Sequence, residues 1–156
     1  LSRHVSALVV LTSWRQRNAV ISGLPKTLAE GLLVQGEGSK QALLQEHRQR
    51  IDEGQSSYLF GVASFSEGLD LPGEYCRHVV IVKLPFSVPD DPVDQAIAEW
   101  AEAQGRNAFY EISVPDASLQ LVQACGRLIR SEKDYGTISM LDKRIVTQRY
   151  GRALIE

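Results

Sequence analysis

The polar residues of segment 123–130, which reads QACGRLIR, have types and a spacing suited to phosphate binding. Gln123, Arg127 and Arg130 stand four and seven residues apart, so on a helix they would share one face. Each guanidinium is permanently charged and offers a planar fork of N–H donors, which matches the oxygens of a phosphate chain. The segment therefore predicts a phosphate-binding group. The alternative is that both arginines form ion pairs with surface carboxylates.

The residues before and within this segment predict the helix that would hold it. Pro115 and Asp116 are typical of a helix start. The side opposite the arginines is apolar and is expected in the core; it carries Leu121, Val122, Cys125, Leu128 and Ile129. Gly126 would then lie in a helix interior, where glycine costs about 1 kcal/mol relative to alanine. We therefore expect a backbone or a ligand to approach closely at this glycine.

Short apolar runs that alternate with segments of helical spacing predict the scaffold. The runs cover residues 7–11, 32–35, 58–63, 78–84 and 137–141, and they are typical of strands buried in a parallel sheet. Helices are expected from Trp14, over residues 39–53 with Gly54 as terminator, and from Asp91-Pro92. In the last of these, the expected core stripe consists of Val93, Ile97 and Trp100. The predicted fold class is α/β, a doubly wound domain of about five or more parallel strands.

Two further segments directly follow predicted strands, which is where a doubly wound fold places its ligand loops. Residues 64–73 read SFSEGLDLPG, and the alternative for them is an ordinary turn rich in glycine and proline. After the first strand, Thr12 and Ser13 carry hydroxyls that can bond a phosphate. Trp14 can stack on a base or pack into the core, and the sequence does not decide between these two roles.

Taken together, these segments resemble the motifs of a known enzyme family. Segment 123–130 resembles motif VI of superfamily 2 helicases, segment 64–73 resembles motif V of the XPD and DinG group, and segment 8–14 resembles its motif IV. Further matches follow in the order of the family: KLPF, DDP, EISVPDA, LDKR and YG, which begin at residues 83, 90, 111, 141 and 150. The resemblance covers nearly the whole chain and points to the bacterial DinG-like helicases, including the similar YoaA type, without separating the two.

The resemblance implies that residues 1–156 form the second RecA-like, P-loop-NTPase-like domain of the motor, with a mostly parallel sheet flanked by helices. Gln123, Arg127 and Arg130 would be the catalytic residues that reach the γ-phosphate of ATP. An N-terminal RecA-like domain of the same polypeptide, absent from this chain, would hold that ATP with Mg²⁺. Residues that join the ATP cleft to the DNA groove would be Glu67, Gly68, Asp70 and Gly126. Residues that bind single-stranded DNA would be Thr12, Ser13, Trp14 and Ser64.

Several family features have no counterpart in these 156 residues. No Walker A loop is present, because GEGSK at residues 36–40 has Ser and Lys in the wrong order and is interpreted as a turn and a helix cap. The two cysteines, Cys76 and Cys125, cannot supply the four ligands of an iron–sulfur cluster, which would belong to the absent part of the protein. The acids around Asp91 are interpreted as helix-capping and solvated groups, so no metal site is assigned. The isolated domain is expected to be inactive.

The net charge and the absence of recognisable targeting segments limit the possible functions and location of the protein. The formal net charge of −2 gives no global signal for nucleic acid, so DNA contacts must be local. No signal peptide or membrane-spanning run is recognisable, so a bacterial cytoplasmic protein is expected. The predicted function is to couple ATP hydrolysis to translocation on single-stranded DNA and duplex unwinding in repair or replication, with proteins of those processes as partners. The alternatives are a DNA- or protein-binding module without a catalytic role, and an unrelated nucleotide enzyme. The second lacks support because His4, His47 and His78 are scattered.

Overall fold

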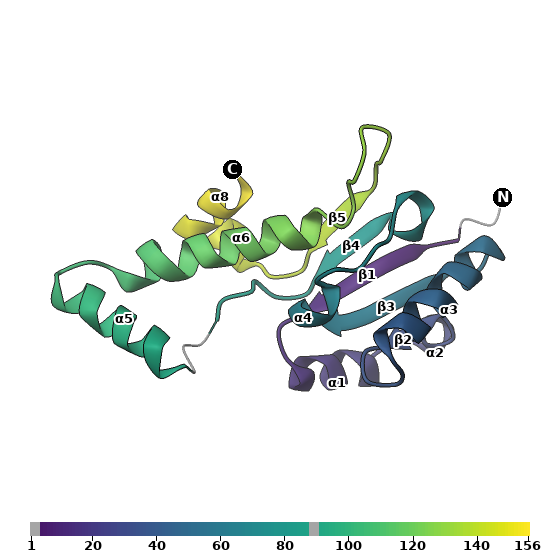
Figure 1. Cartoon of the computed structure of the whole chain (residues 1–156), viewed down its shortest axis with the longest axis horizontal. Helices are drawn as coiled ribbons and strands as arrows, with labels where there is room; N and C mark the ends of the chain where they lie inside the picture. Colours follow the sequence, from purple (N-terminus) through teal and green to yellow (C-terminus); the bar gives the residue numbers. More distant parts are fainter. Residues whose placement is uncertain (1–3, 88–90) are drawn as a thin grey trace. The chain divides into compact units, whose positions relative to one another are not determined.

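A parallel sheet of five strands forms the centre of the fold in the computed structural model, which describes residues 4–87 and 91–156 (Figure 1). Its strands are β1 (Ser6–Leu11), β2 (Leu32–Val34), β3 (Ser57–Val62), β4 (His78–Ile81) and β5 (Thr137–Met140). The order across the sheet is β2-β3-β1-β4-β5, and every neighbouring pair is parallel. The predicted strands are therefore all confirmed, with ends that differ by a few residues.

The central position of β1 follows from its sequence. All six of its residues are buried, and it pairs with β3 from Ser6 opposite Ser57 to Leu11 opposite Val62. On its other side Ala7 lies opposite His78 and Val10 opposite Ile81. A strand covered on both faces is expected to be a nearly continuous apolar run, and residues 7–11 accordingly show no alternation with polar residues.

Helices connect the strands and account for most of the remaining chain. They are α1 (Trp14–Ser22), α2 (Lys26–Ala29), α3 (Lys40–Asp52), α4 (Ala63–Ser66), α5 (Pro92–Ala103), α6 (Val114–Cys125), α7 (Arg144–Thr147) and α8 (Arg149–Ile155). A 3₁₀ turn, η1 (Gly73–Tyr75), precedes β4, and a π-helical turn, η2 (Phe109–Ser113), leads into α6. Asp116 thus lies in the first turn of α6 and not at its cap. None of the helices in residues 4–87 and 91–156 is long and apolar enough to cross a bilayer.

Helix α3 forms as its sequence predicts. The Ser39 hydroxyl caps it by accepting a hydrogen bond from the backbone N–H of Ala42 at 3.1 Å. Leu43, His47 and Ile51 are its buried residues, three or four positions apart. Beyond its last turn, Gly54 has a φ of 76°, in the left-handed region that glycine adopts without steric cost. The interpretation of GEGSK as a turn followed by a helix cap is confirmed.

The chain divides into two compact units. The first unit comprises the chain up to Lys83 together with Gln123–Leu141, and it contains the whole sheet. The second unit, Leu84–Val122 with Asp142–Glu156, contains α5, α7, α8 and most of α6. It also contains an aromatic cluster in which the ring centroids of Phe86 and Phe109 both lie 5.2 Å from that of Tyr150.

The start of α5 is confirmed, but the prediction for its apolar face is wrong. The Asp91 carboxylate caps the helix by accepting from the N–H of Val93 at 2.7 Å; Asp90 lies outside the described residues. The predicted core stripe is exposed: Val93 by 64%, Ile97 by 47% and Trp100 by 58%. Periodicity shows which residues share a helix face, but it does not show whether anything in the chain covers that face.

The buried stripe of α6 also differs from the prediction. The buried positions along α6 and the turn after it are Val114, Ala117, Leu121, Ala124 and Leu128, spaced three and four residues apart. Val122 and Ile129, which were expected in the core, are exposed, and Cys125 is only partly buried. The small residues Ala117 and Ala124 take the buried places, because close packing depends on position around the helix more than on side-chain size.

Candidate functional site

The carboxyl ends of parallel strands lie at one edge of the sheet, and two predicted site segments begin there, after β1 and after β3. Thr12, Ser13 and Trp14 follow β1, Gln35 follows β2, and Ser64 follows β3. Gln35 ties two of these ends together. Its side-chain oxygen accepts a hydrogen bond from the N–H of Val62 at 2.9 Å, and its own N–H donates to Phe60 O at 2.8 Å. The edge is therefore an ordered surface.

The hydroxyls at the end of β1 already have local roles. Ser13 is the N-cap of α1, where its hydroxyl accepts from the N–H of Gln16 at 3.1 Å. The Thr12 hydroxyl donates to the side-chain oxygen of Gln16 at 3.2 Å. A serine hydroxyl that accepts in a cap keeps its hydrogen for another acceptor. Ser13 therefore still has a donor for a phosphate oxygen, whereas the Thr12 donor is used.

Trp14 does not pack into the core. Its side chain is 48% exposed, and the Arg17 guanidinium lies over the ring at 4.5 Å from the centroid. Arg17 is held in turn by its bond from Nη1 to the carbonyl oxygen of Gln35. The core alternative for Trp14 is thus wrong, and the indole is held at the sheet edge beside a positive charge.

The loop after β3 has a shape that separates its apolar from its polar residues. Leu69 and Leu71 are fully buried, whereas Glu67, Gly68 and Asp70 are exposed. Gly68 has a φ of 69°, a left-handed conformation that an L side chain rarely adopts. The two leucines therefore anchor the loop, and the glycine makes the turn that leaves the acidic residues at the surface.

Helix α3 binds this loop along its length. The Lys40 ammonium donates to the carbonyl oxygen of Glu67, and Arg48 Nη2 donates to the carbonyl oxygen of Asp70. Further along, His47 Nε2 lies 2.7 Å from the carbonyl oxygen of Tyr75. Because a carbonyl only accepts, this His47 nitrogen carries the proton. These bonds order loop 67–75 with donors from one helix.

The arginine segment is placed differently from the prediction. Helix α6 ends at Cys125, and the chain continues as a turn in which the N–H of Arg127 bonds to Ala124 O at 3.2 Å. Gly126 therefore lies in an exposed turn, and Arg130 lies beyond the helix. The predicted helical stripe of Gln123, Arg127 and Arg130 is wrong past Cys125. Glycine is a poor helix former and commonly lies just past a helix end, which accounts for this termination.

Arg130 nevertheless contacts the loop after β3. Its Nη1 forms an ion pair with Asp70 Oδ1 at 3.2 Å, and its Nη2 donates to the carbonyl oxygen of Leu69. Asp134 orders the backbone here by accepting from the N–H groups of Arg130 at 2.8 Å and Ser131 at 2.7 Å. These two backbone donors lower the pKa of Asp134. Two predicted segments thus meet at one ion pair, although Asp70 and Arg130 are 60 positions apart in the sequence.

Other predicted residues stay apart from this pair. Gln123 is exposed and Arg127 is partly buried, and within the described part of the chain neither forms an ion pair. Ser64 is exposed in α4 at the sheet edge. Sequence reasoning missed Arg48, whose partner Asp70 lies on another segment, and Asp134, which accepts from backbone N–H groups three and four residues earlier. The only signal for Arg48 was its place next to the buried His47 on α3.

The described residues were also compared with the requirements of a metal site and of a reactive cysteine. Among the described residues, no group of three or more His, Cys, Asp or Glu side chains is arranged to hold a metal ion. Burial raises the pKa of the Cys76 thiol to about 11, and burial also raises the pKa of Cys125. Both cysteines are free.

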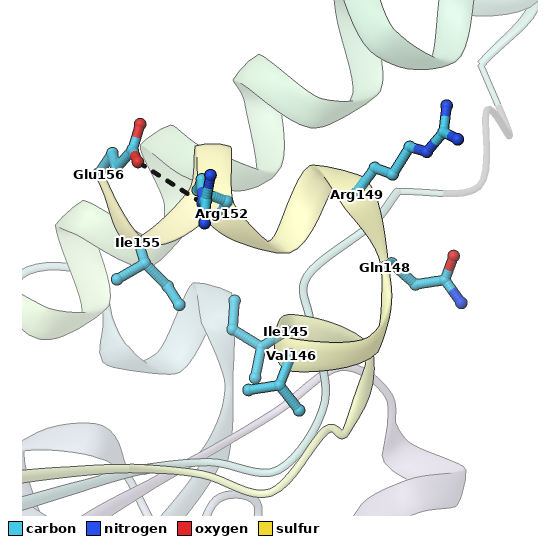
Figure 2. A pocket seen from close by; sticks show the side chains of 7 residues that line it. All are labelled: Ile145, Val146, Gln148, Arg149, Arg152, Ile155 and Glu156. Atoms are coloured by element: carbon cyan, nitrogen blue, oxygen red, sulfur yellow. Dashed lines mark ion pairs between the residues drawn. The ribbon is translucent and has the colours of Figure 1, made fainter.

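The second unit has a separate pocket of about 660 Å³ between α7 and α8 (Figure 2). Ile145, Val146 and Ile155 give it an apolar side, and Arg152 faces Glu156 at 4.0 Å. Arg149 extends away from these residues in Figure 2. The pocket contains no predicted site residue.

The fold and the site together define a class of protein. A parallel sheet in the order β2-β3-β1-β4-β5, with helices connecting its strands, is a RecA-like α/β domain. Neither Walker A nor another phosphate loop occurs in the sequence. The chain belongs to the helicase C-terminal domain family, whose model matches residues 2–156.

Named relatives agree with this assignment. The chain is 46% identical over 159 aligned residues to the ATP-dependent DNA helicase DinG of Photobacterium profundum, covering 100% of the chain and 23% of that relative. It is 38% identical over 154 residues to the DinG helicase of Escherichia coli K12, covering 99% of the chain and 21% of the relative. The predicted resemblance to DinG-type helicases is confirmed. The chain spans less than a quarter of the length of these relatives.

Solved structures show the same fold. A structure described as XPD apo superposes with a TM-score of 0.74 at 24% identity, covering 97% of this chain and 30% of the other. An XPD helicase superposes with a TM-score of 0.72 at 22% identity, covering 98% of this chain and 27% of the other. The predicted RecA-like, mostly parallel fold is confirmed.

Proposed function

We propose that this chain is the second RecA-like motor domain of an ATP-dependent DNA helicase of the DinG type. In the whole protein it couples ATP hydrolysis to translocation on single-stranded DNA and to duplex unwinding, in repair or replication. The names of the relatives support the activity. The domain assignment, residues 1–156 as the C-terminal half of the motor, is supported by the family match and by the lack of a Walker A loop in the sequence.

The observation that carries the proposal is the meeting of Arg130 with the loop that bears Asp70. Arg130 uses two of the five donors of its guanidinium on Asp70 and Leu69, so donors remain for a third partner. Arg127 stands three residues earlier on the same turn-rich segment and forms no ion pair with the described residues. Two arginines of this kind fit the oxygens of a terminal phosphate.

The chain's own part in hydrolysis follows from these donors. ATP would supply the phosphoryl group, and Mg²⁺ would supply positive charge beside the phosphate oxygens. Both would be bound mainly by the N-terminal half of the same polypeptide. Arg127 and Arg130 would place positive charge on the γ-phosphate oxygens, with Gln123 as a neutral hydrogen-bonding partner. An arginine in such a position contributes roughly 10³–10⁵ in rate, because it stabilises charge that develops in the transition state. The isolated chain is therefore inactive.

The sheet edge would bind the DNA. Trp14 is exposed and stacked by Arg17, which suits a base and its phosphate on a single strand. Ser13 retains a hydroxyl donor, and Ser64 lies at the end of the paired strand β3. Glu67, Gly68 and Asp70 lie on the loop that continues from Ser64 toward Arg130, so one short segment links the two functions.

The test is DNA-stimulated ATP hydrolysis by this chain, by the whole protein that carries it and by the whole protein with Arg130→Ala. The whole protein alone is expected to be active, and Arg130→Ala is expected to lower kcat by at least about 10³ while DNA binding is kept. Arg149→Ala is the matched control, because Arg149 is exposed and lies outside the site. Normal turnover in Arg130→Ala would replace the motor proposal with that of a DNA- or protein-binding module.

A further inference from the structure

The carboxylate of Asp70 has two arginine partners on different elements. Arg130 Nη1 lies 3.2 Å from Oδ1, and Arg48 Nη2 lies 3.6 Å from Oδ2. Arg48 also donates to the backbone carbonyl of Asp70. The Asp70 side chain is 66% exposed, so water screens both pairs and neither is strong alone. A carboxylate that is shared by two weakly bound arginines can lose one of them at little cost.

The two arginines are held very differently. Arg48 stands in the middle of α3, next to His47, whose ring is fully buried and lies 2.8 Å from Ser57 Oγ. Its Nε is buried without a hydrogen-bond partner among the described residues, and its Nη2 donates to the carbonyl oxygen of Asp70. Arg130 stands on the irregular segment between α6 and β5. The two arginines thus reach Asp70 from different kinds of backbone: Arg48 from a regular helix beside the buried His47, and Arg130 from a segment without regular secondary structure.

We infer that Arg48 is a positioning residue that retains Asp70 while Arg130 transfers from this carboxylate to a phosphate. The inference rests on the proposed function. When Arg130 leaves, Asp70 keeps a positive neighbour and a bonded carbonyl, so the loop that contains Leu69 and Leu71 stays in place. Without Arg48, the carboxylate would have Arg130 as its only guanidinium partner among the described residues and would hold it back from the phosphate.

This exchange predicts a specific kinetic effect. Arg48→Gln in the whole protein is expected to lower kcat for DNA-stimulated ATP hydrolysis by about threefold to fivefold, the factor that corresponds to one exposed ion pair. Arg48→Lys, which keeps the charge, is expected to recover part of the loss. Arg50→Gln is the matched control. It removes an arginine of the same helix that pairs with Glu46 and does not contact Asp70.

The decisive experiment is a double-mutant cycle with Asp70→Asn. If Arg48 acts through the Asp70 carboxylate, Arg48→Gln must have a clearly smaller effect in the Asp70→Asn background than in the wild type. An equal factor in both backgrounds overturns the inference, as does an equal loss in Arg50→Gln. Thermal unfolding of each variant separates this effect from a loss of folded protein.

A second measurement covers the case in which Asp70→Asn abolishes turnover. The same cycle is then run on the dissociation constant of a non-hydrolysable ATP analogue, where a coupling between Arg48 and Asp70 supports the inference and additivity overturns it. The two proposals fail separately. Normal turnover in Arg130→Ala removes the proposed function, whereas loss of turnover in Arg130→Ala together with an additive cycle removes only the role of Arg48.

Discussion

His47 gives the first unit a pH dependence that can be measured directly. Its side chain is fully buried, with Nδ1 2.8 Å from Ser57 Oγ and Nε2 2.7 Å from Tyr75 O. Burial lowers its pKa, and the nearby positive charges of Arg48 and Arg50 lower it further, whereas the Tyr75 carbonyl opposes the shift. The folded state therefore favours the neutral ring.

The sign of the effect follows from proton uptake. An unfolded histidine has a pKa near 6.5, so below that pH the unfolded chain binds a proton that the folded ring resists. Stability from His47 is thus fully present above about pH 6.5 and is lost as the pH falls. One proton sets an upper limit of about 1.4 kcal/mol per pH unit, or about 1.2 kcal/mol between pH 7 and pH 5.5.

Two tryptophans make a unit-specific assay available, because Trp14 lies in the first unit and Trp100 in the second. In a Trp100→Phe background, urea unfolding followed by tryptophan fluorescence reports on the unit that contains His47. The free energy of unfolding is expected to fall from pH 7 to pH 5.5, and His47→Gln is expected to remove most of that slope. His4→Gln, at an exposed position, is the control. An unchanged slope in His47→Gln would refute the reasoning.

Three other changes test separate parts of the site. Gly68→Ala is expected to cost about 1–2 kcal/mol of unfolding free energy, since its φ of 69° disfavours any L side chain; urea titration measures it. Asp134→Ala removes the acceptor of two backbone N–H groups at Arg130 and Ser131, so faster amide hydrogen exchange is expected at both. Iodoacetamide at pH 8 is expected to modify the partly buried Cys125 before the buried Cys76, as peptide mass spectrometry would show.

The sequence predicts the scaffold well because the scaffold depends on local patterns. A strand buried on both faces, such as β1, is expected to be a nearly continuous apolar run, which residues 7–11 provide, so its sequence alone reveals it. A helix such as α3 carries a capping serine, a periodic face and a terminal glycine within one short segment. Each of these signals is complete without reference to the rest of the chain.

The errors occur where the outcome depends on distant residues. Helical periodicity extended past Gly126 in the prediction, but the chain turns there, and the partner that holds Arg130 is Asp70 on another element. Trp100 has the spacing of a core residue but is exposed. Whether another element covers α5 cannot be predicted from a pattern within the helix itself. Arg48 was missed for the same reason, since its partner lies 22 residues away.

The sequence left two interpretations of Arg130, a phosphate ligand or a surface ion pair, and under the proposed function the two need not exclude each other. The observed partner is a carboxylate, but it is the carboxylate of Asp70, on the loop that the motif pattern had already assigned to the ATP cleft. A carboxylate that is 66% exposed holds a guanidinium in place while binding it only weakly. A doubly charged phosphate can therefore displace it at small cost, and the loop that loses Arg130 is the one that runs back to the sheet edge at Ser64. An ion pair of this kind would transmit the arrival of a nucleotide to the DNA side through a single exchange of partners.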